Sequence, residues 1–168
     1  MRILGCIIII FALLVSCDDG KKKSLMAEFD TLEKQHDSIE KQHVQFESEH
    51  QAMMQGHNEL KSQLGSMESL KDSTVLADMA RHEVIFKKHD ATLKNHSDIL
   101  AAHSELKASF PNKTDVEMEA QITEMKEMHD KMMSEHEELK SEHETITEEH
   151  KSIMEKVKDT TSVEEVEG

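Results

Sequence analysis

The twelve histidines of this 168-residue chain recur at seven-residue intervals. A side chain repeated every seven residues stays on one stripe of an α-helix, because two helical turns take about seven residues. The histidines fall into three sets with longer gaps between them, so the repeat predicts three long helices that pack along a histidine-bearing stripe. The sets are His36, His43, His50 and His57; His82, His89, His96 and His103; and His129, His136, His143 and His150.

Helix-ending and helix-starting residues lie between the sets. Gly65 follows the first set and is a typical residue at a helix end. Before the third set come the single proline, Pro111, and then Thr114 with Glu117 three residues later, which matches a capping box. We therefore expect a helical bundle over 24–158, with helices at about 24–66, 74–109 and 115–158, followed by a disordered acidic tail at 159–168.

The apolar residues predict the direction of each helix. In the first and third sets an apolar side chain follows each histidine by three residues, whereas in the middle set it precedes each histidine by three. A middle helix that runs antiparallel to its neighbours requires this mirrored order, because each apolar residue must stay level with those beside it. The predicted fold class is therefore all-α, an antiparallel up-down-up three-helix bundle of the coiled-coil type.

The positions of the turns predict which histidines lie at the same level. We expect the turns near residues 69–70 and 112–113, so that each layer directs one imidazole from each helix toward the bundle axis. Glutamates directly before a histidine, at 49, 135, 142 and 149, are expected to reach an imidazole of a neighbouring helix. The predicted layers are His43, His96 and His129; His50, His89 and His136; and His57, His82 and His143.

These nine histidines are candidate metal ligands. Histidines seven apart on one helix are separated by about 10.5 Å along the axis, so a metal site must draw its ligands from different helices. Three histidines and a water form a recognised ligand set for Zn²⁺, and imidazole also suits Cu²⁺ and Ni²⁺. The sequence therefore predicts up to three sites for an ion of this class.

Methionine is also frequent, with twelve residues. Thioethers favour Cu(I), but methionine also fills helix interfaces without binding anything. The interface positions expected for Met53, Met125 and Met132 favour the second interpretation. The methionines near histidines are Met53 and Met54, between His50 and His57, and Met125, Met128, Met132 and Met133 around His129.

Two further interpretations of the histidines remain open. Buried polar residues at heptad positions can set the alignment of helices at a cost in stability, which would make the histidines structural. Alternatively, buried imidazoles that gain a proton in mild acid would make the bundle responsive to pH. Either role uses the same inward-facing side chains as a metal site does.

The N-terminus reads MRILGCIIIIFALLVSC, in which one arginine precedes an apolar run that ends at Val15. The run is short for a membrane-spanning helix and is typical of a signal peptide. Leu14-Val15-Ser16-Cys17 resembles the lipobox of bacterial lipoproteins. The resemblance implies a signal peptide at 1–16, lipid on Cys17 and a polar tether at 17–23. It also implies a lipid anchor in the inner or outer membrane of a bacterial cell envelope, with the protein periplasmic or surface-exposed.

A second resemblance concerns the repeated Glu-His pairs in 135–150. They are similar to those of small coiled-coil envelope lipoproteins, some of which are labelled after a viral A-type inclusion protein. That label implies no activity.

Composition restricts the function further. The formal net charge of −15 argues against a nucleic-acid partner, because a polyanion is repelled by nucleic acid. The chain has no glycine-rich phosphate loop, and a slender bundle offers no obvious substrate cleft, so we do not expect an enzyme. The favoured role is structural, or an interaction with an envelope protein or a second copy of the chain. The alternative is binding or buffering of Zn, Cu or Ni, or a pH-responsive bundle.

Overall fold

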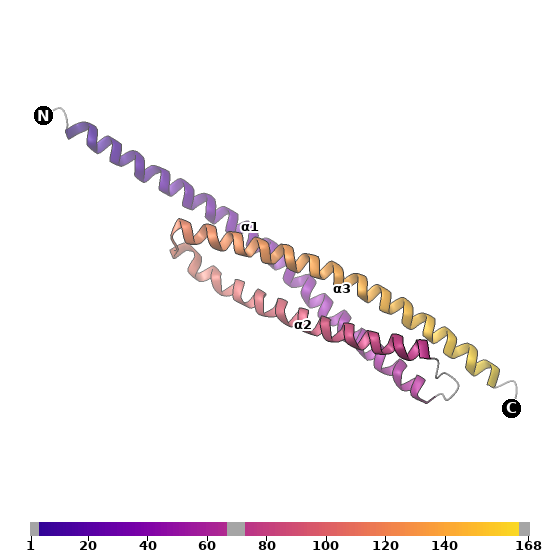
Figure 1. Ribbon diagram of the computed structural model, residues 1–168. Helices are drawn as coiled ribbons and strands as arrows, with labels where there is room; N and C mark the ends of the chain where they lie inside the picture. Colours follow the sequence, from indigo (N-terminus) through magenta and orange to yellow (C-terminus); the bar gives the residue numbers. More distant parts are fainter. Residues whose placement is uncertain (1–3, 67–72, 165–168) are drawn as a thin grey trace. The chain divides into compact units, whose positions relative to one another are not determined.

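Three long helices make up the protein and pack as an all-α three-helix bundle (Figure 1). In this computed structural model, the described backbone covers residues 4–66 and 73–164, and the described side chains cover 20–66 and 74–158. The elements in chain order are α1 (Leu4–Gly65), α2 (Ser73–Ser109), the short 3₁₀ helix η2 (Phe110–Asn112) and α3 (Asp115–Glu164).

Helices α1 and α3 are longer than the sequence predicted. Helix α1 begins at Leu4 and includes 17–23, the segment expected to be a tether, because a single glycine at position 20 weakens a helix without ending it. Helix α3 continues past 158 to Glu164, since no glycine or proline interrupts it, so this part of the expected tail is helical. The rest of that tail, 165–168, lies outside the described residues.

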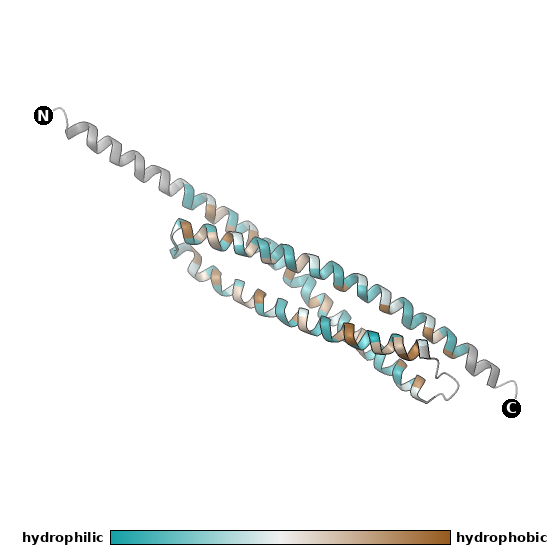
Figure 2. Ribbon diagram, viewed as in Figure 1, coloured by the Kyte–Doolittle hydropathy of each residue, from teal (hydrophilic) through white to brown (hydrophobic). Residues whose placement is uncertain are grey.

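The predicted signal peptide and the side chain of Cys17 also lie outside the part of the chain whose side chains are described. Among the described residues, no helix combines the length and the apolar character needed to cross a membrane. Figure 2 shows that hydrophilic residues cover most of the described helices, with apolar residues at intervals.

The predicted capping and helix-ending residues lie at the ends of the helices, as expected. The backbone N–H of Thr114 donates to Glu117 Oε2 at 2.8 Å, and the N–H of Glu117 donates to Thr114 Oγ1 at 3.4 Å. This reciprocal pair is the predicted capping box, and it satisfies backbone donors that the first turn of α3 would otherwise leave unpaired. Helix α1 ends at Gly65, as expected.

The contacts divide the chain into two compact units, each containing a section of all three helices. Unit 1 comprises Met1–Glu40 and Ile99–Lys131, and unit 2 comprises Lys41–Asp98 and Met132–Gly168. Each unit has its own apolar cluster. In unit 1 the cluster is Leu25, Phe29, Leu32, Phe110, Met118, Ile122 and Met125, and in unit 2 it is Leu60, Leu64, Val75, Met79 and Ile153.

Candidate metal centres

All twelve histidines of the chain meet in groups of three, with one from each helix. In every group, one ring nitrogen of each histidine lies within 4.8 Å of the other two. Eleven of the histidines are buried and His150 is half-buried. Four buried triads can therefore hold metal ions. They are His36, His103 and His129 in unit 1, and His43, His96 and His136; His50, His89 and His143; and His57, His82 and His150 in unit 2.

The pairing of α1 with α2 agrees with the predicted layers, but the position of α3 is wrong by one heptad. His43 and His96 meet His136 instead of His129, and the same shift applies to the other two predicted layers. As a result, the triads also include the histidines that the predicted layers left out, which are His36, His103 and His150. From one triad of unit 2 to the next, the residue numbers rise along α1 and α3 and fall along α2.

Phe110 explains the shift of α3. Its side chain is fully buried, and its ring stacks on that of Phe29 with centroids 3.8 Å apart. The chain therefore continues beyond the end of α2 as η2, and it reverses direction only after η2, before α3 begins. Met118 of α3 lies in the same apolar cluster as Phe110. Residues of α2 and α3 that lie at the same level, such as His96 and His136, consequently have residue numbers that average about 116. The sequence had predicted an average of 112–113.

The spacing of the imidazoles is close to what a metal ion requires. His89 Nδ1 and His143 Nε2 are 3.2 Å apart, and the equivalent pair in the neighbouring triad, His96 and His136, has the same separation. Two nitrogens bound to one tetrahedral Zn²⁺ at about 2.0–2.1 Å are about 3.3 Å apart. These pairs are already at the separation that a shared ion requires, and the third ring nitrogen of each triad lies within 4.8 Å of them.

A glutamate of α3 holds the α2 histidine in every triad of unit 2. The Nε2–H of the histidine donates to the carboxylate, which leaves Nδ1 with its lone pair directed at the other imidazoles. A carboxylate placed in this way orients a metal-binding histidine and increases its basicity. The pairs are His82 with Glu149, His89 with Glu142 at 2.6 Å and His96 with Glu135 at 2.7 Å.

The glutamate contacts predicted from the sequence are thus confirmed at positions 135, 142 and 149. Glu49 instead accepts a hydrogen bond from Gln45 at 2.7 Å. Cations also reach two of the three carboxylates: Lys88 lies 3.1 Å from Glu142, and Arg81 lies 2.7 Å from Glu149.

Side chains of α2 orient two of the α1 histidines, and Ser97 Oγ lies 2.9 Å from His43 Nε2. His50 Nε2–H donates to Asp90 Oδ1 at 3.0 Å, and its Nδ1 has no hydrogen-bond partner among the described residues. In the same triad, His89 Nδ1 and His143 Nε2 already face each other. The candidate ligand atoms for one ion are therefore His50 Nδ1, His89 Nδ1 and, once the His143 proton moves to Nδ1, His143 Nε2.

Burial keeps the α3 histidines neutral. Loss of solvent, and then the charge of the other imidazoles in the triad, lowers the pKa of each from 6.5 to about 4. At pH 7 these rings therefore carry no extra proton, and metal binding does not have to displace one. The four residues are His129, His136, His143 and His150.

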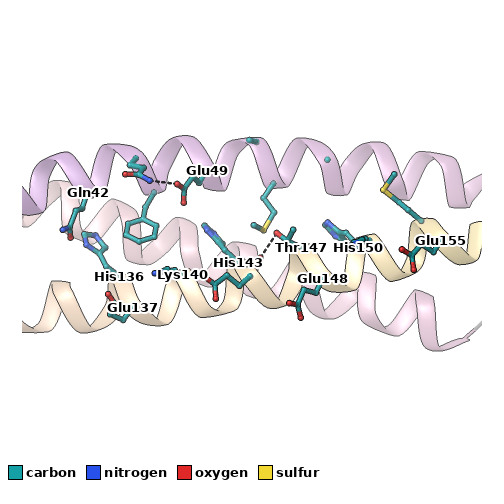
Figure 3. A pocket seen from close by; sticks show the side chains of 18 of the residues that line it. Gln42, Glu49, His136, Glu137, Lys140, His143, Thr147, Glu148, His150 and Glu155 are labelled. Atoms are coloured by element: carbon teal, nitrogen blue, oxygen red, sulfur yellow. Dashed lines mark hydrogen bonds between the residues drawn. The ribbon is translucent and has the colours of Figure 1, made fainter.

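A groove of about 1170 Å³ lies between α1 and α3 in unit 2. Figure 3 shows His136, His143 and His150 on α3 directed toward α1 at this groove. Phe46 and Met53 of α1 line its opposite wall, with the ring of Phe46 centred 4.8 Å from that of His136. The groove brings solvent to the edge of all three triads in unit 2, where a water can complete a three-histidine site.

Comparisons with known proteins add no functional assignment. No family model, no curated protein and no solved structure matches this chain. The four triads and the groups that orient them are therefore the features of the chain that indicate a function.

Proposed function

We propose that this protein binds or buffers transition-metal ions of the Zn²⁺, Cu²⁺ and Ni²⁺ class through its histidine triads. The observation that carries the proposal is the convergence of all twelve histidines into four groups of three, each drawn from three helices. Neutral imidazole is a good ligand for these ions, and three imidazoles with a water form a complete zinc site.

The orphaned ring nitrogens support this proposal. Among the described residues, His50 Nδ1, His136 Nδ1 and both ring nitrogens of His129 are buried without a hydrogen-bond partner. A buried polar group in this state costs about 1–3 kcal/mol. One ion per triad would bind three nitrogens at once, and this would offset much of the cost of burying the rings.

We also propose that the bundle is an antiparallel up-down-up assembly that follows a signal peptide and is anchored in the bacterial envelope by lipid on Cys17. The lipobox-like sequence before Cys17 supports the anchor. The net charge of −15 supports a role with cations, because a polyanion raises the concentration of counter-ions at its surface. The role is binding and not catalysis.

A structural role is the second candidate, and one observation favours it. The α2 histidines of unit 2 have both ring nitrogens hydrogen-bonded, as His89 shows with Glu142 at 2.6 Å and His143 at 3.2 Å. Such a network can set the alignment of helices without any ion. This role, with an envelope protein or a second copy of the chain as partner, predicts no metal binding.

Calorimetric titration of the full-length protein in detergent with Zn²⁺, Cu²⁺ and Ni²⁺ distinguishes the two candidates. We expect binding at micromolar or lower dissociation constants, with one site lost in His96→Ala. Asn95→Ala is the matched control, because Asn95 is the exposed neighbour of His96 and should leave the number of sites unchanged. A folded protein that binds none of the three ions would rule out the metal proposal in favour of the structural one.

A further inference from the structure

One triad differs from the other three in the residue that precedes its α3 histidine. In unit 2 this residue is a glutamate that accepts a hydrogen bond from the α2 imidazole of the same triad. In unit 1 the corresponding residue is Met128, directly before His129. Met128 is half-buried, like those glutamates. The chain therefore places a thioether where the other triads have a carboxylate.

No carboxylate in the described part of the chain forms a hydrogen bond with the imidazoles of the unit 1 triad. Among the described residues, both ring nitrogens of His36 and of His129, and Nδ1 of His103, have no hydrogen-bond partner. One oxygen of Glu33, on the same helix as His36, is paired with Lys107 at 2.7 Å, and its other oxygen is buried without a hydrogen-bond partner within the described ranges. The neighbouring acids of α3, Glu124 and Asp130, are exposed and act on the pKa of His103 and His129 through their charge, without a hydrogen bond.

This triad lies beside the apolar cluster of unit 1. Ring centroids of His36, His103 and His129 lie 5.2–5.9 Å apart. Met125, one helical turn before His129, is fully buried in the apolar cluster of unit 1, together with Met118. The residues that line the groove all belong to unit 2.

We propose that the triad of His36, His103 and His129 is a site for a soft monovalent cation of the Cu(I) class, whereas the three triads of unit 2 take divalent ions. This inference rests on the proposed metal-binding function. The energy of removing an ion from water grows with the square of its charge, so a buried site whose imidazoles have no hydrogen-bonded carboxylate disfavours a dication far more than a monocation.

The types of ligand present at this triad also favour a monovalent ion. Imidazole and thioether are ligands that suit Cu(I), and a monovalent ion held by three imidazoles does not need the fourth ligand that zinc takes from water. Loss of the carboxylate behind a metal-binding histidine typically reduces affinity by about 10–100-fold. The unit 1 triad should therefore be the weakest of the four for Zn²⁺.

The first test is a titration of the full-length protein in detergent with Zn²⁺, followed by Ag⁺ as a redox-inert substitute for Cu(I), in chloride-free buffer. We expect three Zn²⁺ sites of similar affinity and a fourth that is weaker by about 10-fold or more. We expect the zinc-loaded protein to bind one Ag⁺, and His129→Ala to abolish that binding. Four equivalent Zn²⁺ sites, or no Ag⁺ binding, would overturn the inference.

The second test exchanges the residue that differs. Met128→Glu should tighten the fourth Zn²⁺ site by about 10–100-fold, and Glu142→Met should weaken one of the three tight sites by a similar factor. Thr123→Glu, an exposed position on α3, is the control that adds the same charge away from His103. Equal effects of Met128→Glu and Thr123→Glu on Zn²⁺ affinity would contradict the inference. If Met128→Glu fails to fold, the change in Zn²⁺ affinity of Glu142→Met tests the inference instead, and an unchanged affinity would contradict it.

Different results would overturn the proposed function and the inference about the unit 1 triad. A protein that stays folded and binds no ion of either charge would overturn the proposed function and this inference together. A protein that binds four Zn²⁺ ions with one affinity would overturn only the inference about unit 1.

Discussion

Mild acid should destabilise the metal-free protein, because its α3 histidines are neutral when buried. His129, His136, His143 and His150 each have a pKa of about 4 in the folded chain and 6.5 when unfolded. Below pH 6.5 the unfolded chain therefore binds more protons than the folded chain. Stability is fully present above pH 6.5 and is lost as the pH falls toward 4.

The size of the effect follows from those pKa values. At pH 5.5 an unfolded histidine is about nine-tenths protonated and the folded one almost neutral, so each contributes slightly more than about 1 kcal/mol of destabilisation. The four residues belong to four different triads, so their effects should add to about 5 kcal/mol. Burial also lowers the pKa of His57, His89 and His103, which acts in the same direction.

Thermal unfolding followed by circular dichroism, at pH 7.5 and 5.5 with a chelator present, measures this effect. For a protein of this size, 5 kcal/mol corresponds to a fall in Tm of about 10–20 °C. His143→Asn should reduce the fall by roughly a quarter, because it removes one of the four main contributors. An unchanged Tm, or a Tm that rises at pH 5.5 because the glutamates beside the triads hold protonated imidazoles, would refute the reasoning.

Three further predictions concern unit 1 and metal loading. Phe110→Ala should destabilise the protein by about 3–5 kcal/mol in urea unfolding, because it removes a fully buried ring that stacks on Phe29 at 3.8 Å; a loss below about 1 kcal/mol would contradict that packing. Thr114→Ala should cost about 1 kcal/mol in the same assay by breaking the capping box with Glu117, and Thr123→Ala, inside α3, is its control. Zn²⁺ at 100 times its dissociation constant should add about 2.7 kcal/mol of stability per site, and no rise in Tm would argue against binding to the folded state.

The sequence predicted the pairing of α1 and α2 and the inward direction of the histidines, but not the position of α3. Histidine spacing and the mirrored apolar pattern are properties of the helices themselves, so they can be counted along the chain. The level of α3 depends on how far the linker extends before the chain turns back, and this is set by the packing of Phe110 on Phe29. A single linker phenylalanine carries no periodic signal.

One signal for the correct position was nevertheless present. The predicted layers used only nine of twelve histidines, and a shift of α3 by one heptad pairs all of them. The contrast between Met128 and the glutamates that precede His136, His143 and His150 was also visible in the sequence. The sequence alone did not predict that each of these glutamates contacts the α2 histidine of the same triad, and this contact is what makes the contrast with Met128 relevant to metal binding.

X-ray absorption at the zinc edge of the zinc-loaded, dialysed protein tests the central claim most directly. Coordination by the triads predicts about three imidazole nitrogens and one oxygen at about 2.0–2.1 Å from zinc. A shell of oxygens alone, as surface carboxylates would provide, or zinc that is lost on dialysis, would contradict the claim that the triads are metal centres.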